Sequence, residues 1–493
     1  MTSCRFIAIL GVFMFIGREH ELKLLVQFSQ RKVAGLAVCS GRRRIGKSTL
    51  IEEFGKGKTF VEFYGLAPRE GITNTVQLEH FSQQLADNFH IPTVQYKNWH
   101  EALTMLASVT SQGPIIIFFD EISWMASKDK DFVAQLKGIW DTKFKKNPQL
   151  ILILCGSVSS WIQENILKDK GFMGRISLTI NLKELSLPST NQFWLGLKNI
   201  SSYEKCKILG VTGGVPRYLE EINPHETAEQ NIKRLCFTAG GVLFDEFDKI
   251  FDDLFGKHAE EYKNIIRSIL NKHLEIENIA QKLNTTQSGT FNKKLKILEA
   301  CGFIKRDYVW QGSKKKAKLS KYRLSDNYLR FYLKYIEPKK TLIEQGLFTN
   351  LHLEEFDDWY AIMGLQFENL VLSNLPLIQK HLNISSESIL NAAPFFQNKT
   401  QRQQACQIDL LIQTKFTVYV CEIKFRKKIS RDIIDEMMEK IKRLKIPKTL
   451  SIRPVLIYEG ELSETIVREN FFSQIIHFSD LLLVSDGNAA NLS

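Results

Sequence analysis

Paired cysteines are absent from this chain. Its eight cysteines are scattered, and none of them forms a C-x-x-C pair. Cys39, Cys155 and Cys421 lie inside apolar runs, where a free cysteine behaves as a small hydrophobic side chain. This pattern excludes a paired-cysteine zinc site and is typical of a reduced protein. The sequence therefore predicts a cytoplasmic location.

Internal repeats, low-complexity blocks and membrane-length apolar runs are also absent. The apolar run at residues 6–16 resembles the core of a signal peptide, but no small-residue cleavage site follows it. We expect residues 1–13 to be a start-site extension before Met14, with a secretory signal as the alternative. No membrane is expected among the partners.

What the chain does have is length and positive charge. Its 493 residues exceed what one hydrophobic core organises, since a domain takes about 100 to 200 residues. The formal net charge of +12 favours contact with a polyanion. Nucleic acid, and DNA in particular, is the first candidate partner, and an anionic lipid surface is the second.

The N-terminal part alternates strand-like apolar runs with helical patterns. The runs GLAVCS, FVEFY, PIIIFFDE and LILILCGS are short and rich in β-branched or aromatic residues. Such runs separated by helices favour a parallel sheet covered on both faces. We predict an α/β nucleotide-binding core over residues 14–200 and a helical lid over residues 201–258.

The remainder predicts further units. Residues 259–336 contain three short helical patterns and then two strands around a basic turn, which is the layout of a winged helix-turn-helix. A helical linker is expected at residues 337–362, an α/β domain at 363–484 and a disordered polar tail at 485–493. The predicted fold class is α/β multidomain.

The segment GRRRIGKS, residues 41–48, matches the phosphate-binding loop G-x-x-x-x-G-K-[ST] between a strand and a helix. Lys47 is expected to neutralise the β- and γ-phosphates of ATP, and Ser48 to ligate Mg²⁺. A chance glycine turn is the alternative. The residues expected to bind nucleotide here are Gly41, Arg42, Arg43, Arg44, Ile45, Gly46, Lys47, Ser48 and Thr49.

Two acids follow the next predicted core strand. Asp120 is expected to hold Mg²⁺ and Glu121 to polarise the attacking water, although acids in this place also cap helices. Ser157, at the end of LILILCGS, is placed to sense the γ-phosphate. Arg175 is a candidate arginine finger, with an ordinary surface arginine as the alternative.

The ordered set FIGREHEL, GRRRIGKST, IIIFFDE, LCGS, GR and GGVPRYL resembles the archaeal-type ATPase family, an AAA-related branch of the STAND P-loop ATPases, over about residues 14–335. The resemblance implies a nucleotide-dependent switch. It also implies that Gly214 and Pro216 form the G-x-P element that contacts nucleotide from the lid. Members of this family commonly carry a C-terminal region of restriction-endonuclease type.

The predicted wing is strongly basic. A recognition helix at residues 288–299 carries further lysines, so the unit is a candidate DNA-binding element, with an internal hinge as the alternative. The basic residues of wing and helix are Lys314, Lys315, Lys316, Lys318, Lys321, Lys293, Lys294 and Lys296.

Charged residues also interrupt two apolar strands near residue 415. If the strands pair as a hairpin, Asp409 lies beside Glu422, and Lys424 shares the face of Glu422. Two close carboxylates suit Mg²⁺ or Mn²⁺, and the lysine is placed to activate a metal-bound water. The spacing therefore predicts phosphodiester hydrolysis.

This arrangement resembles the PD-(D/E)xK nuclease superfamily over about residues 363–460. Glu368 matches the acid of the leading helix, so the resemblance implies a metal site of Glu368, Asp409 and Glu422 with Lys424 as a catalytic residue. The predicted function is an ATPase switch coupled to DNA binding and cleavage. The alternatives are a plain ion pair or an inactive scaffold domain in a nucleotide-gated signalling module.

Overall fold

The structure, a computed structural model, describes residues 8–483 with gaps at 10–11, 14, 68, 158–159, 170, 196, 198–199, 311–318, 349, 400, 402 and 445. It separates into two compact units. The first covers residues 17–184. The second starts at residue 185 and includes the short pair β1 (Ala8–Ile9) and β2 (Val12–Phe13).

A five-stranded sheet in which every pairing is parallel forms the centre of the first unit. The four strands predicted from apolar runs are confirmed. The fifth was missed because alternate residues of this edge strand are exposed. The order is β4 (Phe60–Tyr64), β5 (Ile115–Asp120), β6 (Leu150–Ser157), β3 (Gly35–Gly41) and β7 (Ile176–Leu182).

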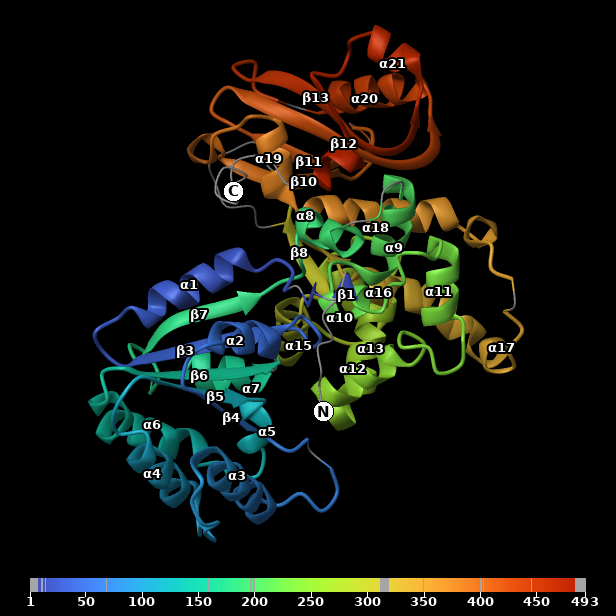
Figure 1. Cartoon of the computed structure of the whole chain (residues 1–493). Helices are drawn as coiled ribbons and strands as arrows, with labels where there is room; N and C mark the ends of the chain where they lie inside the picture. The colour runs from blue at the N-terminus through green and yellow to red at the C-terminus, as the bar shows by residue number, and fades with distance from the viewer. Residues whose placement is uncertain are drawn as a thin grey trace. The chain divides into compact units, whose positions relative to one another are not determined.

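Helices cover both faces of this sheet (Figure 1). On one face Phe81, Trp99 and Phe132 meet edge to face, with ring centroids 5.3 and 4.8 Å apart. These rings come from the three longer helices of that face. The helices of the unit are α1 (Glu19–Ser29), α2 (Lys47–Gly55), α3 (Asn74–Phe89), α4 (Trp99–Val109), α5 (Ile122–Met125), α6 (Phe132–Thr142) and α7 (Ser160–Ile162).

The first part of the second unit is mostly helical. Three helices and then an antiparallel hairpin, which pairs Ile304 with Leu324, occur where a winged helix is expected. That assignment stays a prediction, and Lys314, Lys315, Lys316 and Lys318 lie outside the described residues. The elements are α8 (Leu187–Asn191), α9 (Ser202–Thr212), α10 (Pro216–Leu219), α11 (Ala228–Cys236), α12 (Glu246–Phe255), α13 (Ala259–Ser268), α14 (Ile276–Lys282), α15 (Gly289–Ala300), β8 (Ile304–Tyr308), β9 (Ser320–Leu324), α16 (Asn327–Phe331) and α17 (Lys340–Glu344).

A second five-stranded sheet, in the order β10-β11-β12-β13-β14, forms the last part of the chain. The predicted hairpin is confirmed, since Leu410 lies opposite Cys421, and β13 then joins β12 in parallel. The elements are α18 (Trp359–Ser373), α19 (Leu375–His381), β10 (Asn391–Gln397), β11 (Cys406–Gln413), β12 (Thr417–Ile429), α20 (Asp432–Arg443), β13 (Ser451–Leu462), α21 (Glu464–Arg468), β14 (Gln474–His477) and α22 (Phe478–Leu481).

Alternate residues of β12 pack into two different clusters. Cys421, Ile423 and Phe425 belong to the cluster that includes α18, whereas Val418 and Val420 belong to the cluster that includes α20. Because side chains alternate along a strand, Glu422 and Lys424 face α20. The expectation that these two charged residues share one face is confirmed.

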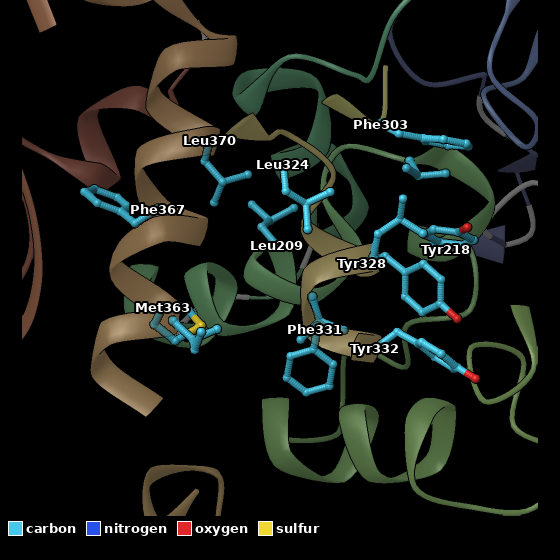
Figure 2. Packing of buried hydrophobic residues seen from close by; sticks show 14 of the residues in the cluster. Leu209, Tyr218, Phe303, Leu324, Tyr328, Phe331, Tyr332, Met363, Phe367 and Leu370 are labelled. Atoms are coloured by element: carbon cyan, nitrogen blue, oxygen red, sulfur yellow. The ribbon is translucent and has the colours of Figure 1, made fainter. Parts of the chain in front are cut away.

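One hydrophobic core runs through the second unit (Figure 2). Leu209 of the predicted lid and Leu324 of the hairpin both belong to it, as do Met363 and Leu370 of α18. A segment as short as the predicted lid buries too little apolar surface to be stable alone. It gains stability by sharing a core with the hairpin and α18. The predicted lid, winged helix and α/β domain therefore pack as one body.

No single helix among the described residues is long and apolar enough to cross a membrane. The bent pair of α18 and α19, with 75° between them, reaches the required length and apolar character only when the two are taken together.

Candidate functional site

The loop between β3 and α2 has the conformation that a phosphate-binding loop needs. Arg44 and Gly46 both adopt left-handed backbone conformations, with φ of 67° and 82°. A Cβ atom on Gly41 would lie 2.8 Å from the Leu182 carbonyl oxygen, so the loop has no room for a side chain there. The turn ends at Lys47, the first residue of α2, whose N-terminus favours an anion.

Lys47 and Ser157 lie together at the loop. The buried Lys47 ammonium donates to the Arg42 carbonyl oxygen at 3.2 Å, and it lies 3.5 Å from Ser157 Oγ at the end of β6. The lysine thus folds back over its own loop, which is where a bound phosphate would be contacted. The two residues predicted to contact the γ-phosphate are brought together.

The two predicted magnesium ligands of this unit are also adjacent. Ser48 Oγ donates to Asp120 Oδ2 at 2.7 Å, so the helix after β3 meets the end of β5. A hydroxyl and a carboxylate are hard oxygen donors of the kind that Mg²⁺ takes beside nucleotide phosphates. These two residues would hold a magnesium ion, which would supply positive charge beside bound phosphate.

Glu121 lies next to this pair in a strained conformation, with φ and ψ of 48°. Its backbone N–H donates to Asp120 Oδ1 at 3.0 Å, and its Oε1 accepts from Ser157 Oγ at 3.5 Å. Burial raises the pKa of the Glu121 carboxyl, and the Lys47 ammonium opposes this rise. Glu121 precedes α5 without any side-chain cap bond, so the helix-capping interpretation is wrong for this residue.

Arg18 supports the loop and was not predicted to do so. Its guanidinium donates to the carbonyl oxygens of Ile45 at 3.0 Å and Lys183 at 2.7 Å, and the side chain is buried. It therefore holds the phosphate loop against the end of β7. The FIGREHEL motif contained the arginine, but nothing in the sequence indicated its partners.

Two of the arginines predicted to bind nucleotide form hydrogen bonds with acidic side chains. Arg42 Nη1 donates to Glu184 Oε1 at 3.0 Å, so this part of its guanidinium is engaged by a carboxylate. Arg175 donates to both oxygens of Asp141, the nearest pair at 2.8 Å, and to the Gly171 carbonyl oxygen. Its role as an arginine finger stays a prediction.

Pro216 belongs to the second unit, as the first residue of α10. The Gly214 carbonyl oxygen before it accepts from the Leu185 N–H at 2.8 Å. The predicted contact of this G-x-P element with nucleotide stays a prediction, as do the roles of Arg43 and Thr49.

Two further acids were missed. Burial raises the pKa of Glu62 on β4 to about 7, and the charges of Asp120 and Glu52 add to that rise. Burial also raises the pKa of Glu52 on α2. When ionised, these carboxyls add negative charge near the proposed magnesium ligands. That charge would favour the binding of a divalent cation.

In the second unit Asp409, Glu422 and Lys424 converge as the hairpin predicts. Asp409 Oδ2 accepts from the Ile423 N–H at 2.9 Å, which fixes the side chain beside β12. Lys424 Nζ lies 2.7 Å from Glu422 Oε1. Burial raises the pKa of Asp409, and the neighbouring Glu422 carboxylate adds to that rise.

Lys440 is a residue of this cluster that the sequence did not reveal. From α20 its Nζ donates to both carboxylate oxygens of Glu422, at 2.6 and 2.7 Å. Glu422 is only 1% exposed, so two ammonium groups balance one buried carboxylate. Nothing in the local sequence around Lys440 indicated that its side chain would lie beside Glu422.

Glu368 approaches from α18, which packs on the opposite face of the sheet from Glu422. Burial raises its pKa, and the charge of Asp409 adds to that rise. Its Oε1 lies 3.8 Å from His273 Nε2, and neither atom has a hydrogen-bond partner among the described residues. Burial lowers the pKa of His273 to about 3, so this imidazole is neutral near pH 7.

The acids of this cluster have the right chemistry for a divalent cation but not the spacing. Carboxylates are the ligands that Mg²⁺ and Mn²⁺ prefer. Within the described parts of the chain, however, no three His, Cys, Asp or Glu side chains stand close enough to hold a metal ion. The predicted site of Glu368, Asp409 and Glu422 stays a prediction.

Two of the basic residues predicted to contact DNA lie beside acids. Lys294 pairs with Glu261, and Lys321 lies 4.0 Å from Glu275. Arg426 on β12, near the proposed cleavage residues, also pairs with an acid, Asp432, at 3.2 Å. These ion pairs are partly exposed and therefore contribute little free energy. A DNA phosphate could replace the acid at small cost in stability.

Comparison with known proteins finds similarity to a family of ATPase domains in the first part of the chain. Residues 15–222 match the family described as an ATPase domain predominantly from Archaea. An uncharacterized protein of Methanocaldococcus jannaschii is 27% identical over 435 residues, which cover 85% of this chain and 89% of that protein. Another protein of that organism, described as ATP-binding, is 40% identical over 48 residues, which cover 10% of this chain and 81% of that protein.

Among solved structures, the Walker-type ATPase of Pyrococcus abyssi is similar with a TM-score of 0.49 and 18% identity. The similarity covers 65% of this chain and 96% of that one. The family match to residues 15–222 confirms the expected archaeal-type ATPase domain. The C-terminal region lies outside that match.

Proposed function

We propose, from the premise of an archaeal-type ATPase domain at residues 15–222, that the chain binds ATP with Mg²⁺ at the loop of residues 41–48 and hydrolyses it. The observation that carries the proposal is the 2.7 Å bond between Ser48 and Asp120 beside the partly buried Glu121. The two proposed metal ligands and a candidate base then stand together where the first turn of α2 meets the end of β5.

Each of these side chains has a task that its surroundings suit. Lys47 is placed to neutralise phosphate charge, and Ser48 with Asp120 would hold the magnesium ion, which supplies further charge neutralisation. Because burial raises its pKa, the Glu121 carboxylate is a stronger base than an exposed glutamate and is better matched to accept a proton from water. Ser157 would orient Glu121 through the contact between them.

Paired measurements of nucleotide binding and hydrolysis test this proposal. Lys47→Ala should weaken Mg-ATP binding and abolish turnover, because the loop loses its buried ammonium. Lys23→Ala is the matched control, since this lysine is exposed on α1. Binding and turnover at wild-type levels in Lys47→Ala would refute the site.

We propose further that the nucleotide state is transmitted through the shared core of the second unit. Asn327 Nδ2 donates to the carbonyl oxygens of Leu209 on α9 and Gln366 on α18, both at 3.2 Å. A movement of the predicted lid would therefore reach α18 through buried amide contacts. This supports an ATP-driven switch with its output in the C-terminal region.

A second candidate function is metal-dependent cleavage of DNA, favoured by the convergence of Asp409, Glu422 and Lys424. Asp409 and Glu422 would hold the cation, which would lower the pKa of an attacking water, and Lys424 would orient that water. The double ion pairing of Glu422 favours instead the rival reading of an inactive scaffold.

A plasmid-nicking assay with Mn²⁺ decides between the two readings. Wild-type protein should nick DNA, and Glu422→Gln should not, while ATP hydrolysis is unchanged. Glu464→Gln is a suitable control because this glutamate is highly exposed on α21. Absence of nicking in the wild type, or equal nicking in Glu422→Gln, would favour the scaffold.

A further inference from the structure

A pocket of about 230 Å³ lies in the second unit, between the hairpin of β8 and β9 and the second sheet. One wall is formed by residues of the hairpin. The opposite wall comes from the end of α18, the start of α19 and the strands β10 and β11. The volume is below the roughly 300 to 1,000 Å³ of pockets for drug-sized molecules, so the pocket has room for a small ligand.

The hairpin wall of this pocket is charged. Lys305 lies directly opposite Arg323 in the antiparallel register, so both side chains share one face, and Asp307 follows Lys305 by two residues on that face. All three residues line the pocket. Among the described residues Arg306 lines it as well, so three cations and one acid surround the space. This balance favours an anion.

The guanidinium of Arg323 has one nitrogen without a partner. Its Nε donates to Asp307 Oδ2 at 2.7 Å, and its Nη1 donates to Asn369 Oδ1 on α18. Its Nη2 has no hydrogen-bond partner among the described residues, although the side chain is only 3% exposed. A buried donor without an acceptor is costly, and a bound ion is one ordinary explanation for it. Nη2 is therefore the part of Arg323 that is left to contact a ligand.

The wall opposite the charged residues is largely apolar. Leu372 of α18 and Leu410 of β11 line it, with Ala392 and Pro394 of β10 beside them. An inorganic ion would leave this wall uncovered. A ligand with a compact apolar body would cover it, which is the usual combination of an apolar lining with a few polar groups that fix orientation.

We propose that this pocket binds a small organic anion, whose carboxylate or phosphate head group contacts Arg323 Nη2 and Lys305 and whose apolar body lies against Leu372 and Leu410. Such a ligand contacts the hairpin and the C-terminal sheet at once. Binding therefore stabilises the second unit increasingly as the ligand concentration rises. The inference goes beyond ATP hydrolysis and does not depend on it.

The test is calorimetric titration of the full chain with butyrate and, separately, with inorganic phosphate. A Lys47→Ala background weakens anion binding at the phosphate-binding loop, and sodium chloride of equal ionic strength controls for screening. We expect saturable binding and a higher unfolding temperature with at least one probe. The probe that binds more tightly identifies the head group. Absence of saturable binding by both probes overturns the proposal.

Two charge variants locate the binding. Arg323→Lys keeps a cation beside Asp307 but supplies no second nitrogen, so affinity should fall about tenfold, the size expected for one charge-assisted hydrogen bond. Lys305→Ala changes an exposed side chain and should weaken binding about threefold. Lys257→Ala, exposed just after α12, is the matched control. Weaker binding in either pocket variant, with the control unchanged, supports the proposal.

A change of shape gives an independent test. Ala392→Leu narrows the pocket from β10 without changing a charge and should abolish binding of both probes. Undiminished binding in Ala392→Leu would place the probe elsewhere and overturn the proposal. If Arg323 served only the fold, Arg323→Lys would unfold at a lower temperature without ligand while its affinity for both probes stayed unchanged, which also overturns it. Circular dichroism confirms that the compared variants are folded.

Discussion

The Ser48 hydroxyl donates to Asp120 Oδ2 at 2.7 Å, which joins the first turn of α2 to the end of β5. This hydrogen bond holds the two oxygen atoms that are proposed to bind magnesium next to each other, at the end of β5. Both residues were predicted as magnesium ligands from separate motifs. Their contact links the phosphate loop to the acids of β5.

Ser48→Ala tests this link. Removing the hydroxyl should weaken Mg²⁺-dependent ATP binding by about tenfold, the lower range for losing one group that supports a metal. Binding is measured by titration of ATP with and without Mg²⁺. Ser48→Thr retains the hydroxyl and should bind like the wild type. Equal affinity of Ser48→Ala and wild type would contradict the assignment.

Arg18→Met tests whether the Arg18 guanidinium stabilises the phosphate-binding loop. The variant loses two charge-assisted hydrogen bonds to buried carbonyl oxygens, at Ile45 and Lys183. The first unit should be destabilised by about 3 kcal/mol, because buried acceptors are left unpaired. Chemical unfolding measures the change, and Lys23→Met on the surface of α1 is the control. A loss no larger than that of the control would show that Arg18 does not hold the loop.

The raised pKa of Glu62 predicts that the stability of the first unit depends on pH. Its pKa is about 7 in the folded chain, above the usual value of 4.5, so the folded state binds more protons between these values. Stability therefore falls as the pH rises from about 4.5 to 7 and is constant above that range. Glu62→Gln should remove this decline and, since Glu62 is partly exposed, gain only about 1 kcal/mol at pH 8.

Thermal unfolding without nucleotide or Mg²⁺ measures that dependence. The midpoints of wild type and Glu62→Gln should converge at pH 4 and separate at pH 8. Glu79→Gln, an exposed residue of α3, is the control. Parallel pH profiles for wild type and Glu62→Gln would contradict the raised pKa.

Asn327→Ala tests the connection between the predicted lid and α18. The variant loses hydrogen bonds to Leu209 and Gln366 inside the core, which should cost about 3 kcal/mol. Thermal unfolding of the full chain is the measurement, with the exposed Gln281→Ala as control. If both variants unfold at the wild-type temperature, the amide link does not stabilise the second unit.

Local motifs predicted much of the first unit. Four strands, the loop at residues 41–48 and the meeting of Ser48 with Asp120 follow from apolar runs and fixed spacings. The edge strand β7 was missed because its alternating pattern lacks a continuous apolar run. A resemblance to archaeal-type ATPases predicted an ATPase domain of this type, and the family match over residues 15–222 supports that domain.

Side-chain partners far apart in sequence were not predictable. Arg18 contacts Lys183, Arg175 contacts Asp141, and Lys440 contacts Glu422. Each contact depends on how helices pack on a sheet, which local periodicity does not encode. The wider STAND placement, the winged helix and the nuclease resemblance stay predictions.

The central claim is that Glu121 activates water at an ATP site. Single-turnover hydrolysis of Mg-ATP by Glu121→Gln is the most direct measurement, with Glu79→Gln as control. We predict wild-type ATP affinity and hydrolysis slowed by about a hundredfold or more, the usual range for losing a general base. Hydrolysis by Glu121→Gln at the rate of the wild type would contradict the account.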